Sequence, residues 1–296
     1  GLGDVYKRQN TSVAALTAVV VGRGAAARPA PAASVVRAFT LAGGVMVEGA
    51  VELPDGDLIV AGHGAPPIAL RGGALPECAA DVRLRCGFLA RVSPTGEQRW
   101  ARALRADADV TVHAPVLAGD LVIAAGDVAG RAWFADEGAG PRGRDAFVAG
   151  FDPADGTLRW FRRLAAPGGH VRAVAADPDG GIYVSGDADQ ALAWDRGWRP
   201  AVGAAPGDGT GFLIAFDAAG AQRWIQTVAG QVPMRFQAVA AVGDQVLWGG
   251  ASQGPARAAD GVTLAATAGS VVLAIDRASG QRRLSLIHIS EPTRPY

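Results

Sequence analysis

The chain has 296 residues, of which 49% are hydrophobic and 19% charged, and its 28 basic and 28 acidic side chains give a net charge of zero. This apolar content excludes wholesale disorder. The balanced charge offers no basic surface for nucleic acid or an anionic membrane. The 41 Gly and 18 Pro supply many turn residues without the three-residue period of collagen. The length suits one large all-β domain or two ordinary domains, and no segment predicts a transmembrane helix.

The two ends of the chain differ in composition from its interior. Lys7 is the only lysine and Asn10 the only asparagine, whereas the interior is dense in Ala, Gly, Arg, Val, Pro and Asp. Residues 1–9 and 285–296 resemble translated sequencing-adapter sequence, so we interpret both as artefacts and exclude them from fold reasoning. Residues 10–34 contain an apolar run followed by small residues and prolines. This segment predicts either a secretory signal peptide or a truncated strand.

An internal repeat occupies most of the remaining sequence. Each copy contains a turn glycine, followed four residues later by Trp in three copies and by Leu284 in the last. The turn glycines are Gly96, Gly156, Gly220 and Gly280, and the tryptophans are Trp100, Trp160 and Trp224. An earlier glycine series has the same period of 60–64 residues: Gly62, Gly126, Gly186 and Gly250. Two interleaved series with one period indicate a repeat array or a propeller.

Each period predicts four short strands, which we call A to D. In the third copy they are expected near residues 170–176, 182–186, 211–217 and 221–228, with Asp-, Pro- and Gly-rich turns between A and B and between C and D. The fold class is therefore all-β: a β-propeller of about four complete four-stranded blades, expected to be part of a larger propeller. The propeller is expected over 35–284, with blades at about 45–105, 106–165, 166–229 and 230–284. Residues 35–41 predict a further strand, which either closes the ring against the last blade or belongs to an upstream blade.

The repeated Trp and Gly residues are predicted to be structural. A Trp at one fixed place near the start of strand D is positioned to fill the gap between adjacent blades. Stacking on a carbohydrate or a base is the alternative, but a position shared by three units more often serves the repeat itself.

Two family resemblances rest on these motifs. Asp-Pro-Asp-Gly-Gly-Ile-Tyr-Val-Ser-Gly at 177–186, followed by the segments at 211–224 and, in the preceding copy, 145–160, resembles the bacterial β-propeller repeat family called SBBP. The resemblance covers about residues 45–284 and implies a secreted or surface-associated bacterial protein. The C–D piece, as in Asp152, Gly156 and Trp160, also resembles the tryptophan-docking motif of quinoprotein dehydrogenases. That motif is structural in both families, so the resemblance carries over no catalytic residue.

The long connections between strands B and C form a candidate recognition face. They span about 63–86, 127–145, 187–210 and 251–269, and they differ in sequence while the strands repeat. In a four-stranded antiparallel blade these B–C connections emerge on the same side as the D–A connections, so we expect binding there. Trp133, Trp194 and Trp198 are candidate contacts on this face. The alternative is that these connections only cover the blade edges.

A second set of candidate binding residues lies on the predicted innermost strand A. Aligning the repeats places four polar residues at equivalent positions among apolar neighbours: Glu48, His113, Arg172 and Gln237. We expect them to form a polar ring at one mouth of the central channel; the alternative is that a wet channel wall simply tolerates polar side chains. His113 has no metal-ligand partner at close sequence spacing, so no metal site is predicted.

The two cysteines, Cys78 and Cys86, lie in one B–C connection and match no zinc or redox spacing. In an exported protein they predict a disulfide that closes this loop.

Enzyme motifs are absent from the sequence: it has no Gly-x-Ser-x-Gly, His-Glu-x-x-His or Gly-x-x-x-x-Gly-Lys. We therefore predict an exported, non-enzymatic β-propeller without a cofactor or catalytic residue. Its partner is expected to be a protein, a small molecule or a glycan, and not a nucleic acid. The alternatives are a fragment of a quinoprotein-like dehydrogenase, which needs carboxylates for calcium and a quinone, and a fragment of a propeller lyase or glycosidase.

Overall fold

The computed structural model describes residues 16–19, 38–41, 45–70, 73–75, 78, 85–113, 115–135, 144–164, 168–188, 208–231, 234–265 and 269–287. This part of the chain is built of antiparallel strands with one short 3-10 helix, η2 (Trp133–Ala135). Within it, no helix has the length and apolar character needed to cross a membrane. The all-β prediction is confirmed.

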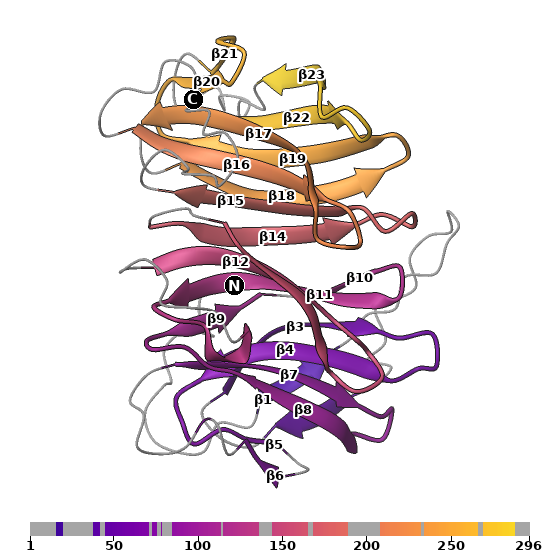
Figure 1. Ribbon diagram of the computed structural model, residues 1–296. Helices are drawn as coiled ribbons and strands as arrows, with labels where there is room; N and C mark the ends of the chain where they lie inside the picture. Colours follow the sequence, from indigo (N-terminus) through magenta and orange to yellow (C-terminus); the bar gives the residue numbers. More distant parts are fainter. Residues whose placement is uncertain are drawn as a thin grey trace, which may run out of the picture.

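Four antiparallel sheets follow one another along the chain, from the lower to the upper end of the view in Figure 1. Blade 1 contains β3 (Val45–Glu52), β4 (Leu58–Gly64), β7 (Cys86–Val92) and β8 (Gln98–Leu104). Blade 2 contains β9 (Val110–Val112), β10 (Val116–Ala118), β11 (Leu121–Ala129), β12 (Arg144–Phe151) and β13 (Leu158–Arg163). Blade 3 contains β14 (His170–Ala176), β15 (Ile182–Ala188), β16 (Asp208–Phe216) and β17 (Gln222–Gln231). Blade 4 contains β18 (Met234–Val242), β19 (Gln245–Ser252), β22 (Gly269–Asp276) and β23 (Arg282–Ile287).

The predicted four-stranded blades are confirmed, with two differences of detail. Strand A of blade 2 is divided into β9 and β10, and both pieces pair with β11. Strand β23 continues to Ile287, three residues beyond the boundary expected at 284, because these residues still pair with β22.

Two of the B–C connections contain short strands that the sequence did not predict. In blade 4, β20 (Ala256–Ala258) and β21 (Thr263–Ala265) form a hairpin, and β20 pairs with β17 of blade 3. This connection therefore extends the neighbouring sheet to six strands. In blade 1, β5 (Ala69–Leu70) pairs with β6 (Gly73–Ala74).

The strand expected at 35–41 has a different partner from the one proposed for ring closure. It forms β2 (Ala38–Leu41), which pairs with β1 (Leu16–Val19) and not with a strand of blade 4. The two ends of the series of blades lie far apart in Figure 1, so the four described blades form an open arc.

Neighbouring blades are joined by the repeated tryptophans. The Trp160 indole N–H donates to the carbonyl of Ala218 at 2.9 Å, and the Arg162 Nε donates to the carbonyl of Gly220 at 2.9 Å. Gly220 has a φ of 73°, and a Cβ there would lie 2.5 Å from the Trp160 ring. The other junctions use the same contacts: Trp100 with Pro153 and Gly156, and Trp224 with Arg277 and Gly280. Each ring thus lies on the turn glycine of the following blade.

Apolar layers fill the space between the sheets. In blade 3, Tyr183 and Leu213 are completely buried in the layer shared with blade 4. The outer face of blade 1 is covered by Ile68, Leu75 and Cys78 from its own B–C connection. On the outer face of blade 4, Leu247 and Val272 occupy the positions of Tyr183 and Leu213 but are each 37% exposed. Among the described residues, the inter-blade packing therefore ends at blade 4.

We predict that Gly220→Ala destabilises the protein more than Gly243→Ala. Both glycines have a positive φ, 73° and 59°, but a Cβ at Gly243 meets no atom within 4 Å. Gly243→Ala should therefore lower the free energy of unfolding by about 1–2 kcal/mol, from backbone strain alone. Gly220→Ala should lower it by about 1–3 kcal/mol more, because the ring must move. Urea unfolding of both variants measures the difference, and equal losses would contradict the docking role of the glycine.

Candidate functional site

A β-bulge interrupts strand A of the blades where the sequence predicted a polar ring. The register shifts between Val47 and Gly49 in β3, between Val171 and Ala173 in β14, and between Arg235 and Ala238 in β18. In blade 2 the gap between β9 and β10 takes the place of the bulge. The residues at these interruptions include the four predicted ones: Glu48, His113, Arg172 and Gln237. A bulge leaves a residue unpaired and changes the direction of its side chain.

The strand B glycines make room for these bulges. A Cβ at Gly62 would lie 2.1 Å from the carbonyl oxygen of Met46, and a Cβ at Gly126 would lie 1.9 Å from that of Thr111. The same close approach occurs in the other two blades, at Gly186 with His170 and at Gly250 with Arg235. The second glycine series in the sequence is therefore explained by the close approach of strand A to strand B.

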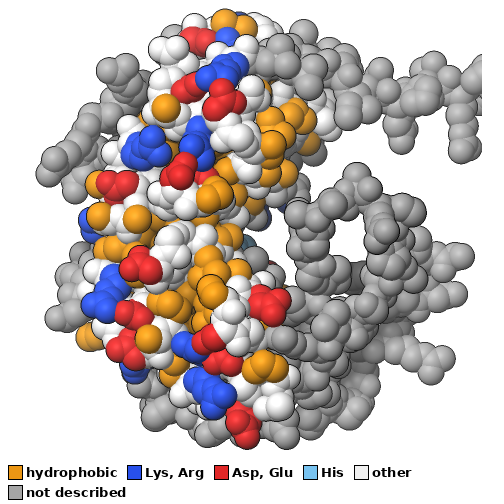
Figure 2. Space-filling view, turned by 90° about the vertical axis from the view of Figure 1, so that its right-hand side faces the viewer, with side chains coloured by type: hydrophobic (Ala, Val, Ile, Leu, Met, Phe, Trp, Pro, Cys, Tyr) orange, Lys and Arg blue, Asp and Glu red, His pale blue; other side chains and the backbone are white. Residues whose placement is uncertain are grey.

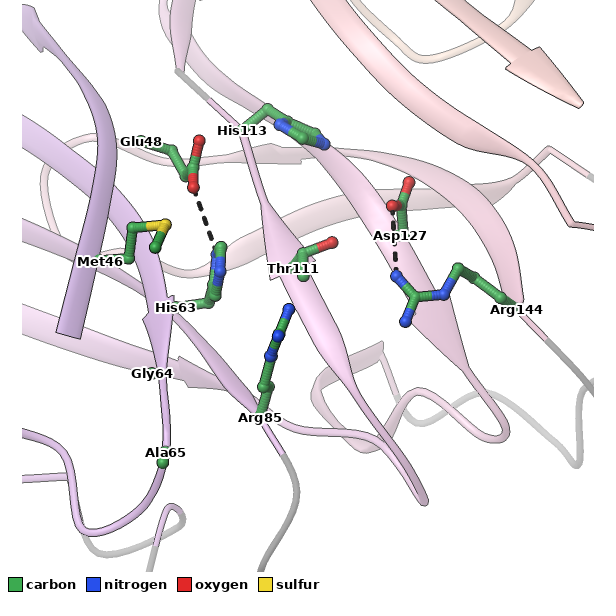
Figure 3. Close-up of a pocket in the computed structure, with 10 residues that line it drawn as sticks. All are labelled: Met46, Glu48, His63, Gly64, Ala65, Arg85, Thr111, His113, Asp127 and Arg144. Carbon is green, nitrogen blue, oxygen red and sulfur yellow. Dashed lines mark ion pairs between the residues drawn. The ribbon is translucent and has the colours of Figure 1, made fainter. Parts of the chain in front are cut away.

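A pocket of about 350 Å³ lies between blades 1 and 2, at the end of the strands from which the B–C connections emerge. Two of the four residues of the predicted ring, Glu48 and His113, line it (Figure 3). Its other lining residues are Met46, His63, Gly64, Ala65, Arg85, Thr111, Asp127 and Arg144. The volume falls within the usual range for small-molecule sites.

Two of the charged residues of the pocket are already paired. Arg144 lies 3.6 Å from Asp127 and 3.8 Å from Asp109. The buried Asp127 carboxylate also lies 2.8 Å from the His170 Nδ1 and accepts the backbone N–H of Val171 at 2.9 Å. Since His170 and Val171 belong to β14, Asp127 also ties blade 2 to blade 3.

The Arg85 guanidinium, in contrast, has no ion-pair partner in the described part of the chain. Its backbone N–H donates to Asp109 at 2.8 Å, but no described carboxylate forms an ion pair with its side chain. The side chain is directed toward the space between His63 and Thr111 (Figure 3). The next residue, Cys86, forms a disulfide with Cys78 and begins β7, so the predicted disulfide is present and fixes the backbone beside Arg85.

Three residues that line the pocket each have a buried polar atom without a hydrogen-bond partner among the described residues: the His63 Nδ1, the Thr111 Oγ1 and the His113 Nε2. Thr111 is 6% exposed and His63 is 8% exposed. Glu48 is the nearest charged group to His63, at 3.8 Å. Buried polar groups normally have a partner, so three such residues around one pocket are unusual.

Burial lowers the pKa of both pocket histidines. For His63, the burial effect exceeds the opposing attraction of Glu48, and for His113 it exceeds that of Asp127 and Glu48. Both imidazoles are therefore neutral at pH 7, and each has one nitrogen that donates and one that accepts.

The other predicted site residues lie outside this pocket. Arg172 is bound to Asp187 by two hydrogen bonds of 2.7 and 3.0 Å, and Gln237 is exposed on blade 4. Trp133 is 48% exposed; its indole N–H donates to Asp107 at 2.9 Å, and the Arg131 guanidinium lies 4.4 Å from the ring centroid. Trp194 and Trp198 lie outside the described residues.

Several pocket residues were not identified from the sequence. His63, Asp127 and Asp187 each follow directly after a strand B glycine, a position occupied by Ala251 in blade 4. Extending the repeat alignment by one residue would have found this signal. Arg85 and Arg144 occupy equivalent positions of the repeat, three residues before Phe88 and Phe147, so the same alignment would have found them. Thr111 has no polar counterpart in blade 1, where Met46 takes its position.

The described residues do not fit a calcium-and-quinone site. Among them, no group of three or more His, Cys, Asp or Glu side chains is placed to hold a metal ion. The pocket offers the carboxylates of Glu48 and Asp127, and Asp127 is already bound by His170 and Arg144.

Charges of both signs are interspersed over the described part of the surface in Figure 2. Many are paired, such as Arg277 with Asp179 at 2.7 Å and Arg282 with Asp260 at 2.6 Å.

Comparison with known proteins gives similarity of fold only. No family model and no curated protein matches the chain, so the resemblance to the SBBP repeat stays a prediction. Among solved structures, BamB from Moraxella catarrhalis is 14% identical, with a TM-score of 0.43, 86% of this chain and 68% of that chain covered. A quinohemoprotein alcohol dehydrogenase, ADHIIG from Pseudomonas putida HK5, is 15% identical, with a TM-score of 0.37, 69% of this chain and 32% of that chain covered. A europium-containing methanol dehydrogenase is 13% identical, with a TM-score of 0.40, 86% of this chain and 51% of that chain covered. The repeated antiparallel sheets themselves identify this chain as a β-propeller protein.

The lowered histidine pKa values predict acid sensitivity. Because the folded protein disfavours protonation of His63 and His113, the unfolded chain binds more protons as the pH falls below about 6.5, and stability decreases. The double variant His63→Gln/His113→Gln should therefore lose less stability between pH 7.5 and pH 5.5 than the unmodified protein. Urea unfolding at both pH values measures the two losses. Equal losses would show that these imidazoles do not titrate as described.

Proposed function

We propose that the protein is an exported, non-enzymatic binding propeller that holds a small polar ligand in the pocket between blades 1 and 2. One observation carries this proposal: three residues that line the same pocket, His63, Thr111 and His113, each have a buried polar atom without a hydrogen-bond partner among the described residues. Leaving such an atom unsatisfied costs about 1–3 kcal/mol. A ligand that pairs with these atoms recovers that free energy, which favours a site adapted to binding over one adapted to stability.

The position of the pocket supports the same function. The tryptophan contacts lie at the C–D turns, whereas the pocket lies at the B–C end of the strands. The C–D turns hold the blades together with repeated residues, and the B–C end carries the residues that differ between blades. Binding sites are commonly built in this way, on variable positions supported by a rigid scaffold.

Export is supported by the disulfide between Cys78 and Cys86. Disulfides persist mainly in oxidising compartments outside the cytosol.

We predict opposite effects of Thr111→Val on stability and on binding. The substitution keeps the shape of the side chain and removes an unsatisfied hydroxyl, so the free energy of unfolding should be unchanged or higher. Binding should weaken, because a neutral hydrogen bond contributes about 0.5–1.5 kcal/mol. Saturation-transfer NMR with a library of amino acids, hydroxy acids and small sugars identifies ligands, and titration calorimetry measures their affinities.

Thr210→Val is the matched control. Thr210 is 2% exposed in β16 and its hydroxyl also lacks a partner, but it does not line the pocket. This variant should match Thr111→Val in stability and the unmodified protein in binding. If no library member binds, or if both variants bind as the unmodified protein does, the proposed site is wrong.

A further inference from the structure

The charged residues of the pocket define what kind of ligand it accepts. Arg144 and Asp127 lie 3.6 Å apart, and each has a further protein partner. Arg85 has no carboxylate partner among the described residues, and Glu48 has only the distant contact of 3.8 Å with the neutral His63. Within the described lining of the pocket, the cation Arg85 and the anion Glu48 therefore remain for a ligand. The positive and negative side chains of this lining are equal in number.

Arg85 and Thr111 together form a set of donors for an anionic group. The planar guanidinium matches a carboxylate or a phosphate through two parallel hydrogen bonds. The Thr111 hydroxyl is buried and has no partner among the described residues, and Thr111 lines the same pocket as Arg85 (Figure 3). The His113 Nε2 adds a third unpartnered atom in the same cavity.

The remaining lining residues favour a carboxylate over a phosphate. Asp127 is already paired with Arg144, but Glu48 lines the same cavity, so a dianion would be repelled by this carboxylate while it gained only one free arginine. A monoanion with a hydrogen-bond donor at its other end is compatible with all of these groups, because Glu48 accepts hydrogen bonds. The volume of about 350 Å³ lies within the range of small-molecule sites.

We propose that this pocket binds a small monocarboxylate that carries an ammonium or hydroxyl group close to the carboxylate, that is, an amino acid or a hydroxy acid. The carboxylate binds Arg85 and Thr111, and the amino or hydroxyl group binds Glu48. This inference rests on the proposed function and specifies the ligand class of the same site.

The test uses the full chain and five probes: L-alanine, L-lactate, propionate, propylamine and inorganic phosphate. Titration calorimetry should show that alanine and lactate bind about tenfold or more tightly than the other three, because only they pair with both free charges. Arg85→Gln should weaken alanine and lactate binding by about tenfold or more. Glu48→Gln should weaken alanine binding by a larger factor than lactate binding, since only alanine places a cation beside it.

Two exposed residues provide matched controls. Arg257 on β20 and Glu97 in the turn before β8 lie outside the pocket. Arg257→Gln and Glu97→Gln make the same chemical changes as the pocket variants, and they should leave all five affinities unchanged. Urea unfolding midpoints show whether each variant is folded.

The outcomes separate this inference from the proposed function. Tighter binding of phosphate, or alanine and lactate affinities unchanged in Arg85→Gln, would overturn the ligand class. If a sugar binds and depends on Thr111 but not on Arg85, the proposed function stands and the ligand class is wrong. If no probe binds the unmodified protein, the ligand class is also wrong, and the wider library then decides on the proposed function.

Discussion

The contact between each repeated tryptophan and the turn glycine of the next blade is the constraint on which the arrangement depends. It combines a hydrogen bond from the indole to a turn carbonyl with a ring that fills the space where a Cβ would stand. The contact acts between sheets and not within one. It therefore fixes the orientation of consecutive blades, which the strand pairing alone leaves free. The position of the pocket follows from it, because the pocket is formed by residues of two blades.

At the opposite end of the strands, from which the B–C connections emerge, a different close approach determines the backbone geometry. In each blade, strand B has a glycine at the point where it meets a carbonyl oxygen of strand A. A Cβ at this glycine would lie only 1.9–2.6 Å from that oxygen. This permits an interruption in strand A, and the interruption presents one polar side chain per blade. In blades 1 and 2 those side chains, Glu48 and His113, enter a shared cavity. In blade 3 the equivalent residue, Arg172, is bound by Asp187. The same interruption of strand A thus contributes to the proposed ligand site at one junction and to an internal ion pair at another.

The sequence predicted the blades well because each depends on local, repeated signals. Turn glycines, alternating apolar strands and a Trp at constant spacing are all visible within one period of 60–64 residues. It predicted the pocket only in part. Glu48 and His113 were found through the repeat, whereas Arg85 was overlooked although Arg144 takes its position in blade 2, and Thr111 takes the position of the apolar Met46. The pairing of β20 with β17 was also missed, because that contact joins two different blades and has no counterpart in the repeat.

The histidine side chains give the most direct test of the central claim, that the unsatisfied atoms of the pocket bind a ligand. The chain has only four histidines, so their imidazole nitrogens can be resolved individually in a long-range nitrogen–proton NMR spectrum. Spectra of the full chain recorded with increasing L-alanine or L-lactate should show the nitrogen signals of His63 and His113 moving the most, with assignments from the single His→Gln variants. Unchanged signals from these two residues at ligand saturation would contradict the account.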